Sequence, residues 1–299
     1  MGERTVLSYF VADVFTNKSY SGNPLAVVFT EGDLESAQYE NIAREFGYSE
    51  TSFVYYAPAQ KALNVRSFTP TGFEVHGAGH NLLGAVCAAL LNGLDIFKEQ
   101  DEDRFVIMKD ARIPVTVAIE NKTQSPSVKM KQRAAVIGNT VSVELIADAL
   151  GLTIENIGFQ KLLPTIVKTE VAHIMVPVVN RGALYNIKRD NKKLAEISKQ
   201  FGFEGFYCFA FTNAEEPHVV ESRFFNPLIG IDEDAATGTA AGPLAGFLAL
   251  NHLIKSGMPY KILQGVPLNQ PSTIEVMVRD TGILVGGSSV ITMKGEVYL

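Results

Sequence analysis

Two helix-forming stretches with apolar residues on every side constrain the fold of this chain most. Residues 82–91 read Leu-Leu-Gly-Ala-Val-Cys-Ala-Ala-Leu-Leu and stop at Asn92-Gly93, and residues 240–250 are equally apolar and rich in Ala and Gly. A helix without a polar face cannot lie on a surface, so other structure must enclose it. Because the same pattern occurs once in each half of the chain, we expect two similar halves, each built around one buried helix.

The segments around these two helices have the composition of strands. We expect strands at residues 5–15, 25–29, 51–57, 63–69, 154–158, 172–179, 206–211, 221–225, 260–264, 273–279, 283–286 and 290–299. Two further helices are expected at residues 33–46, ending at Gly47, and at 188–201. The predicted fold class is α+β, with two pseudo-duplicated domains, each a curved, mostly antiparallel sheet wrapped around a central buried helix.

The domain boundary is expected near the polar residues 120–125 and the segment 132–140. This gives a first domain at residues 1–125 and a second at 126–299. Whether the last strand or strands cross back to the first domain is left open.

The composition of the chain argues against a membrane or a nucleic acid as its partner. The chain has 299 residues, 46% of them hydrophobic, which is typical of a globular protein, and its apolar stretches are too short to span a bilayer. Met1-Gly2-Glu3-Arg4 leads into a strand rather than a signal peptide, so we expect a cytoplasmic protein without a membrane partner. The net charge is −6 and basic residues do not cluster with aromatic ones, which argues against nucleic acid.

The starts of the two apolar helices are candidate anion sites. Gly77-Ala-Gly79-His80 precedes the first helix and Thr237-Gly238-Thr239 precedes the second. A first turn without large side chains exposes backbone N–H groups at the positive end of the helix dipole, where a carboxylate or phosphate binds. Two alternatives stay open: the small residues allow close packing on a sheet, or Thr237 and Thr239 are ordinary N-caps.

Three ionisable residues are candidates for the chemistry of a site. Two of them are at or near the starts of the apolar helices, and the third is in a separate segment rich in hydroxyl groups. Glu50 stands in Ser49-Glu50-Thr51-Ser52, His80 begins the first apolar helix, and Asp234 precedes the second. Two carboxylates and an imidazole suit proton transfer on a small anionic substrate. Each residue has a plainer alternative: an exposed loop acid for Glu50, a helix-capping role for His80, and pairing of Asp234 with a helix terminus or with Arg223.

Three other kinds of site fit the sequence poorly. Glu74, His76 and His80 are spaced almost like metal ligands, but the glycines between the histidines argue against the regular helix such a site needs, so no metal is expected. The spacing of Gly77, Gly79 and Gly84 is not that of a dinucleotide-binding loop, and no parallel strand-helix-strand pattern is expected around it. A Gly-x-Ser-x-Gly serine hydrolase motif is missing around Ser49 and Ser52.

Short pieces along the whole chain, in one order, resemble the phenazine biosynthesis protein F family of the diaminopimelate epimerase-like fold. The matching pieces are Asp13-Val-Phe15, Gly22-Asn23-Pro24-Leu-Ala-Val27, Glu45-Phe-Gly-Tyr-Ser-Glu-Thr-Ser-Phe53, Phe68-Thr69-Pro70, Gly79-His80, Asp234-Ala-Ala-Thr-Gly-Thr-Ala-Ala-Gly-Pro243 and Gln264-Gly265. The resemblance implies two similar domains with the active site in the cleft between them, a homodimer, and no metal or organic cofactor.

The resemblance also implies roles for individual residues. The family's general acid/base matches Glu50, and the positions matching His80 and Asp234 assist it. Asn23, Ser49, Gly79 and Thr239 match positions that line the substrate cleft; with Thr237 and Gly238 from the second helix start, they complete the expected substrate-binding set. The best-known family reaction isomerises dihydro-3-hydroxyanthranilate by moving a hydrogen between two ring carbons.

Related racemases and epimerases of this fold use two thiols, one from each half. Those positions match Ala78 and Ala235, and the two cysteines, Cys87 and Cys208, lie elsewhere inside apolar runs. Alanine cannot carry a proton, so two-base racemisation is not expected, and both thiols are expected to be buried and outside any disulfide.

The loop between Thr69-Pro70 and Gly79 departs from the family pattern. It carries one additional residue, taken as Phe73, and has His76-Gly77 where relatives have other pairs. The effect on specificity, and with it the substrate, is open. The alternative to an isomerase is a non-catalytic small-molecule or partner-binding protein, which would have no need of Glu50, His80 and Asp234 together.

Overall fold

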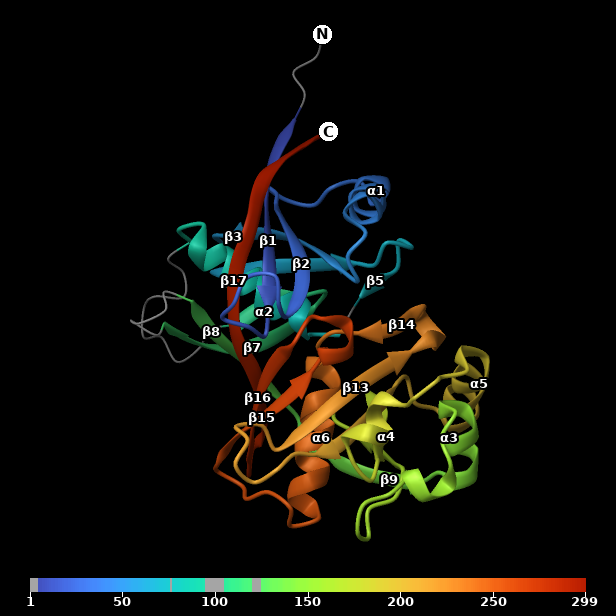
Figure 1. Cartoon of the computed structure of the whole chain (residues 1–299). Helices are drawn as coiled ribbons and strands as arrows, with labels where there is room; N and C mark the ends of the chain where they lie inside the picture. Colours follow the sequence, from blue (N-terminus) through green and yellow to red (C-terminus); the bar gives the residue numbers. More distant parts are fainter. Residues whose placement is uncertain (1–4, 76, 95–104, 120–124) are drawn as a thin grey trace. The chain divides into compact units, whose positions relative to one another are not determined.

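The computed structural model of the chain describes residues 5–75, 77–94, 105–119 and 125–299 (Figure 1). By packing, the chain forms two compact units: unit 1 comprises Met1–Lys131 and Gly286–Leu299, and unit 2 comprises Gln132–Val285. The boundary expected between residues 125 and 126 stays a prediction, because compactness does not test independent folding, and residues 120–124 lie outside the described residues.

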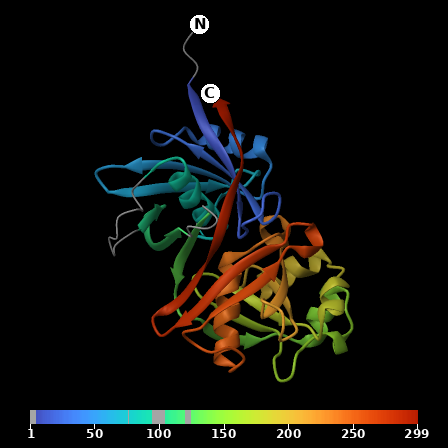
Figure 2. The same ribbon diagram turned by 60° about the vertical axis from the view of Figure 1, so that its left-hand side comes forward.

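The strands of unit 1 form a closed ring. β1 pairs with β2 and β17, and successive pairs lead from β2 through β3, β4, β6 and β7 to β8, which reaches β17 again. Figures 1 and 2 both show β1 (blue) and β17 (red) side by side. The elements are β1 (Val6–Val14), β2 (Asn23–Phe29), α1 (Ser36–Phe46), β3 (Thr51–Ala57), β4 (Ala62–Phe68), β5 (Glu74–Val75), α2 (His80–Leu91), β6 (Phe105–Met108), β7 (Ala111–Ile119), β8 (Pro126–Gln132) and β17 (Gly282–Tyr298).

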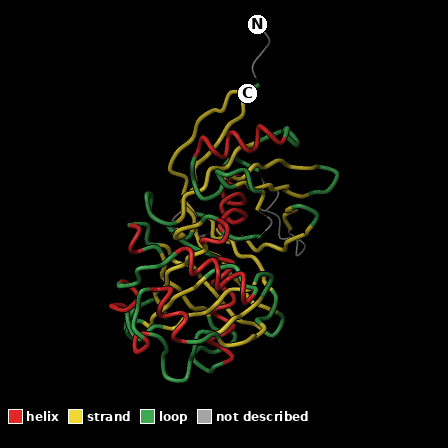
Figure 3. Tube along the Cα trace, turned by 90° about the vertical axis from the view of Figure 1, so that its right-hand side faces the viewer, coloured by secondary structure: helices red, strands yellow, loops and turns green. Residues whose placement is uncertain are grey.

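The helix α2 lies inside this ring, where Figure 3 shows it surrounded by strands. All its residues except Leu91 are buried. At Gly84 a Cβ atom would lie 2.6 Å from Leu25 Cδ2 and 2.7 Å from Val14 Cγ2, so the glycine lets the helix rest directly on β1 and β2. The amphipathic helix α1 instead packs Tyr39 and neighbouring apolar residues against the outer face of the sheet and ends at Gly47, as expected.

Unit 2 has the same plan. Its strands run in the paired order β9, β10, β11, β12, β13, β15, β16, with β14 beside β13. Helices α3, α4 and α5 cover one face of this sheet and the buried helix α6 covers the other. The elements are β9 (Val136–Thr140), α3 (Val143–Leu150), a 3-10 helix (Ile154–Asn156), β10 (Thr165–Lys168), β11 (Ala172–Pro177), α4 (Arg181–Tyr185), α5 (Asn191–Phe201), β12 (Phe206–Phe211), β13 (Val220–Asn226), a 3-10 helix (Pro227–Ile229), β14 (Ile231–Asp234), α6 (Gly238–Leu250), β15 (Pro259–Gln264), a 3-10 helix (Val266–Leu268) and β16 (Ser272–Arg279).

Matching crossovers confirm the pseudo-duplication. In unit 1, β2 and β3 are parallel with α1 between them in the chain, and β4 and β6 are parallel with α2 between them. In unit 2, α4 and α5 connect the parallel β11 and β12, and α6 connects the parallel β13 and β15. The pairs β1–β2, β1–β17, β3–β4, β6–β7, β12–β13 and β15–β16 are antiparallel, and the expected fold class is confirmed. The expectation of no parallel pattern around α2 is wrong, because β4 and β6 form one.

Two sequence-based strand predictions are wrong. Residues 154–158 do not form a strand, because Asn156 Oδ1 accepts a hydrogen bond from the Thr153 backbone N–H at 3.4 Å and residues 154–156 close into a 3-10 turn. Residues 283–286 and 290–299 are not two strands, since β17 continues through the small residues between them and Ser289 pairs with Val14. The register between β1 and β17 shifts once, between Val11, which faces Met293, and Ala12, which faces Ile291.

Candidate active site

Glu50 and His80 are neighbours in unit 1. Glu50 lies between the C-cap of α1 and the first residue of β3, and His80 is the first residue of α2. The Glu50 Oε2 and His80 Nδ1 atoms are 4.0 Å apart, and the two side chains are 13% and 7% exposed. The exposed-loop alternative for Glu50 is therefore wrong. The catalytic role of the pair stays a prediction.

Burial decides the charge of His80. Removal from water disfavours the imidazolium and lowers the pKa of His80 to about 4. At neutral pH the ring is uncharged, with one nitrogen donating and the other accepting. Its Nε2 atom is buried and has no hydrogen-bond partner among the described residues. The ring can therefore give or take one hydrogen bond with a bound molecule.

The start of α2 is less bare than the sequence predicts. The side-chain oxygen of Asn81 accepts hydrogen bonds from the Gly79 and Leu82 N–H groups at 2.7 and 2.8 Å, and its Nδ2 donates to the Gly77 carbonyl at 3.0 Å. Asn81 thus fixes the turn that presents His80. Sequence reasoning missed this residue, although an Asn within a glycine-rich helix start is a recognisable capping signal.

Unit 1 also contains three of the residues expected to bind the substrate: Asn23, Ser49 and Gly79. Asn23 is the first residue of β2, opposite Val14, and is 2% exposed. Ser49 precedes Glu50, and its buried Oγ has no hydrogen-bond partner among the residues that the structure describes. Gly79 is buried at the N-cap of α2.

In unit 2, Asp234 lies at the end of β14, and Thr237 is the N-cap of α6. The Thr237 hydroxyl donates to Asp234 Oδ2 at 2.6 Å, and both residues are buried. Thr237 is therefore not an ordinary N-cap, since its side chain makes no capping bond to the helix. The Arg223 guanidinium donates to both oxygens of Glu233, at 2.8 and 2.7 Å, and pairing of Asp234 with Arg223 stays a prediction.

Gln264, at the end of β15, ties this segment together. Its Nε2 donates to the Asp234 carbonyl at 2.9 Å and to the Thr237 hydroxyl at 3.1 Å. Its Oε1 accepts from the Tyr207 hydroxyl at 2.9 Å and from the Thr237 N–H at 3.2 Å. The residue is fully buried, and every donor and acceptor position of its amide is used. In the sequence, Gln264 stands out only as part of Gln264-Gly265, one of the pieces that resemble the family.

Gly238 and Thr239 form the first turn of α6. Gln132 Nε2 donates to the Gly238 carbonyl at 2.9 Å, while the Ala240 and Ala241 N–H groups bond back to the Thr237 carbonyl at 3.2 and 3.0 Å. The turn is thus held from within the helix and by the Gln132 side chain. Anion binding at either helix start stays a prediction.

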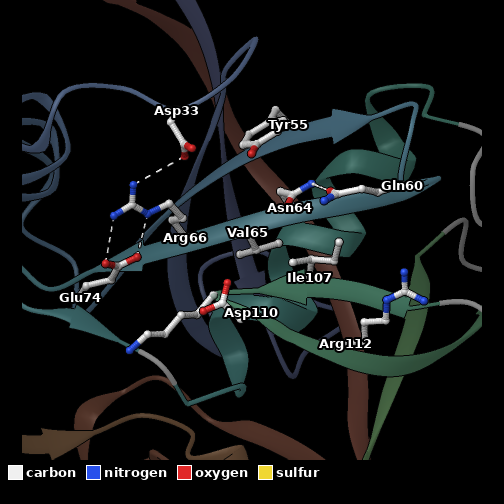
Figure 4. Close-up of a pocket in the computed structure, with 11 residues that line it drawn as sticks. Asp33, Tyr55, Gln60, Asn64, Val65, Arg66, Glu74, Ile107, Asp110 and Arg112 are labelled. Atoms are coloured by element: carbon white, nitrogen blue, oxygen red, sulfur yellow. Dashed lines mark hydrogen bonds and ion pairs between the residues drawn. The ribbon is translucent and has the colours of Figure 1, made fainter.

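A hollow of about 470 Å³ on unit 1 lies away from these residues. Figure 4 shows its polar lining: Arg66 donates to Glu74 at 2.7 and 3.0 Å and lies 3.5 Å from Asp33. Glu74, one of the residues with near-ligand spacing, is therefore held by an arginine, and His76 lies outside the described residues. No group of three or more His, Cys, Asp or Glu side chains in the described part of the chain is arranged to hold a metal ion.

The loop that departs from the family pattern is tied to the end of β4. The Thr69 N–H donates to the Phe73 carbonyl at 2.9 Å, and the Phe73 N–H donates to the Thr69 hydroxyl at 3.2 Å. The Phe73 side chain is 57% exposed.

The two cysteines cannot serve as proton carriers for a substrate. Cys87 and Cys208 are both free and fully buried, as expected. Burial raises the pKa of Cys87 to about 12 and raises the pKa of Cys208 further. Neither thiol forms a thiolate near neutral pH, and neither is at the positions of Ala78 and Ala235.

The sequence profile of the family described as phenazine biosynthesis-like protein matches residues 12–295. The chain belongs to this family. The trans-2,3-dihydro-3-hydroxyanthranilate isomerase of Pseudomonas aeruginosa is 30% identical over 298 residues, covering 97% of this chain and 99% of the relative. The uncharacterized isomerase YddE of Escherichia coli K12 is 29% identical over 299 residues, covering 95% and 96%. The family expected from the short motifs is confirmed, and the chain is an isomerase.

The chain is similar to solved structures of the same family and to solved structures that share only its fold. A phenazine biosynthesis protein of this family from Bacillus anthracis superimposes with a TM-score of 0.85 at 25% identity, covering 99% of this chain and all of that one. A hydroxyproline epimerase from Agrobacterium vitis has a TM-score of 0.61 at 10% identity, covering 98% and 93%. The second likeness concerns the fold alone and confirms its epimerase-like class. None of the helices in the described ranges has the length and apolar character needed to cross a membrane.

Proposed function

We propose that this isomerase works without a cofactor and moves a proton between two carbons of a small, cyclic carboxylate, with Glu50 as the single acid/base. The C–H bond at the first carbon breaks as Glu50 accepts the proton, and its electron pair stays in the conjugated substrate. The same proton then returns from Glu50 to the second carbon. The net change is a shift of one hydrogen, so no oxidant, reductant or co-reactant is needed.

The pairing of Glu50 with His80 carries the proposal. A carboxylate that is 13% exposed, 4.0 Å from a nearly buried imidazole, is the arrangement in which a general base avoids competition from water. Because burial keeps His80 neutral, its ring can hydrogen-bond a substrate without neutralising the Glu50 carboxylate as an imidazolium would.

The remaining residues are assigned to the substrate. We assign Asp234 as an assisting group and Asn23, Ser49, Gly79, Thr237, Gly238 and Thr239 as substrate contacts. The helix starts favour an anionic group, since their backbone N–H groups carry partial positive charge. The first substrate to test is trans-2,3-dihydro-3-hydroxyanthranilate, which the Pseudomonas aeruginosa relative is named for. A homodimer, as the family resemblance implies, is part of the proposal.

The test follows deuterium incorporation from heavy water into that compound by mass spectrometry. Glu50→Gln keeps the shape of the side chain but cannot accept a proton, so turnover should fall by about 10²–10⁴-fold while ligand binding is kept. Glu45→Gln is the matched control, because Glu45 is an exposed glutamate of the same unit.

Two results separate the parts of the proposal. Undiminished exchange in Glu50→Gln would end the assignment of Glu50. Exchange into other cyclic amino acids, but not into trans-2,3-dihydro-3-hydroxyanthranilate, would overturn the substrate and leave the mechanism standing.

A further inference from the structure

The hydrogen bonds around Gln264 can point in one direction only. The Thr237 backbone N–H is always a donor, so the amide atom that it meets at 3.2 Å must be the oxygen Oε1. The Asp234 carbonyl is always an acceptor, so the atom 2.9 Å from it must be the nitrogen Nε2. Two backbone groups therefore fix the orientation of the amide without reference to any hydrogen position.

The orientation of the Gln264 amide determines the direction of the hydrogen bonds at the Thr237 hydroxyl. The amide nitrogen donates to the Thr237 hydroxyl at 3.1 Å, so that oxygen acts as an acceptor towards Gln264. Its own proton is then available for the contact of 2.6 Å with Asp234 Oδ2. This hydrogen bond stabilises the charged form of Asp234, so the carboxylate binds a proton less readily than it would without the Thr237 hydroxyl.

Tyr207 secures the far end of the amide. Burial raises the pKa of Tyr207, so its hydroxyl keeps its proton and donates to Gln264 Oε1 at 2.9 Å. It thereby occupies the second acceptor position of the oxygen and stabilises the amide orientation that the backbone groups select.

We propose that Gln264 and Tyr207 are positioning residues: through the Thr237 hydroxyl they hold Asp234 as a carboxylate of fixed orientation. The catalytic meaning rests on the assisting role proposed above for Asp234. Glu50 has to gain and lose a proton, whereas Asp234 is kept from doing so. The two acids thus have different tasks.

Other charges in unit 2 could also act on Asp234. The titratable and charged groups on neighbouring strands include Tyr207 on β12, Arg223 on the paired strand β13, and Glu233 next in the chain on β14. Arg223 and Glu233 form a bidentate pair, so their charges largely cancel. The experiment must therefore isolate the effect of the hydroxyl.

The experiment follows the side-chain carboxyl carbon of Asp234 by ¹³C NMR, assigned with Asp234→Asn, as the pH is lowered while folded signals persist. In the wild type the Asp234 signal should stay at the carboxylate position. Thr237→Val should raise the pKa of Asp234 by about one unit, because a hydrogen bond to the charged form is lost. Gln264→Met should raise it in the same direction, because the Thr237 hydroxyl loses the donor that keeps its own proton turned to Asp234. Thr237→Ser keeps the hydroxyl and should restore wild-type behaviour.

The double variant Thr237→Val/Gln264→Met is decisive. If Gln264 acts through Thr237, the pKa shift of the double variant equals that of Thr237→Val alone. Additive shifts, or an unchanged Asp234 in Gln264→Met, would overturn the proposal. Gln132→Met is the matched control: it removes another buried amide at the start of α6, and should leave the Asp234 titration unchanged.

Two further measurements keep the result interpretable. If Gln264→Met does not fold, Tyr207→Phe provides a milder change and should shift the titration in the same direction by less; no shift would count against the proposal. With turnover of a substrate, Gln264→Met should lower kcat more than it raises KM. Because the NMR titration needs no substrate, failure of the positioning role is distinguishable from failure of the proposed reaction.

Discussion

Lowering the pH from 7 to 5 should destabilise the folded chain through His80. The ordinary pKa of the ring is 6.5, and burial lowers the pKa of His80 to about 4. Between these values the unfolded chain binds a proton that the folded chain excludes. The free energy of unfolding therefore falls as the pH drops below 6.5 and levels off only below the folded pKa.

The size of the effect follows from the two pKa values. At pH 5 proton binding favours the unfolded over the folded chain about 30-fold, which is a loss of about 2 kcal/mol in the free energy of unfolding. The same arithmetic applies to His173, which is 1% exposed and whose pKa burial lowers to about 3. At pH 5 it contributes roughly another 2 kcal/mol. His80 lies in unit 1 and His173 in unit 2.

The assay compares urea unfolding at pH 7 and pH 5 in the wild type, His80→Gln and His173→Gln. Each variant should lose about 2 kcal/mol less than the wild type between the two pH values, because glutamine does not titrate. Ring NMR signals of His80 should stay those of a neutral imidazole down to pH 5. The reasoning fails if His80 titrates above pH 6.5, since the Glu50 carboxylate, and not burial, would then set its charge.

Four other substitutions test the packing at Gly84, the absence of a catalytic role for the two cysteines, and the ion pair of Arg223. Gly84→Ala should lower the free energy of unfolding by about 1–3 kcal/mol, because the added methyl meets β1 and β2; an unchanged melting temperature would contradict the contact. Cys87→Ala and Cys208→Ala should each cost on the order of 1–2 kcal/mol and leave turnover intact, whereas a strong loss of turnover would revive a thiol mechanism. Arg223→Met removes the bidentate partner of the nearly buried Glu233 and leaves it the Arg189 guanidinium at 3.8 Å, so it should cost about 3 kcal/mol in thermal or urea unfolding; a near-neutral result would show that Arg189 or water compensates the carboxylate.

The elements that could be predicted are those with a strong burial signal. The helices α2 and α6 are apolar all round, and their limits follow the expected ranges within a few residues. The strand β9 gave no such signal, because all its residues are exposed and no alternation arises. The helix α3 was missed although Ser142 caps its start and Gly151 ends it with φ at 64°. Its short length gave too few turns for a clear period.

The candidate site divides in the same way. Glu50, His80 and Asp234 could be selected because their chemistry and motifs are local in the chain. The bonds that orient them are not local: Gln264 is separated from Thr237 by 27 residues and from Tyr207 by 57. Only the packing of β12 and β15 in one sheet brings these side chains together, and no pattern in a single sequence encodes that register.

The duplicated fold does not duplicate the chemistry. Each unit presents an acid near the start of a buried helix, but Glu50 comes from the loop between α1 and β3, whereas Asp234 ends β14, four residues before α6. Glu50 has a neutral imidazole as its neighbour, while Asp234 accepts a hydrogen bond from Thr237 whose direction a buried amide fixes. A mechanism with two equivalent bases would need two groups that can exchange roles. Because the surroundings of the two acids differ in this way, we expect one acid to carry the proton and the other to stay charged, which is why Glu50→Gln and Asp234→Asn should change the pH dependence of turnover differently.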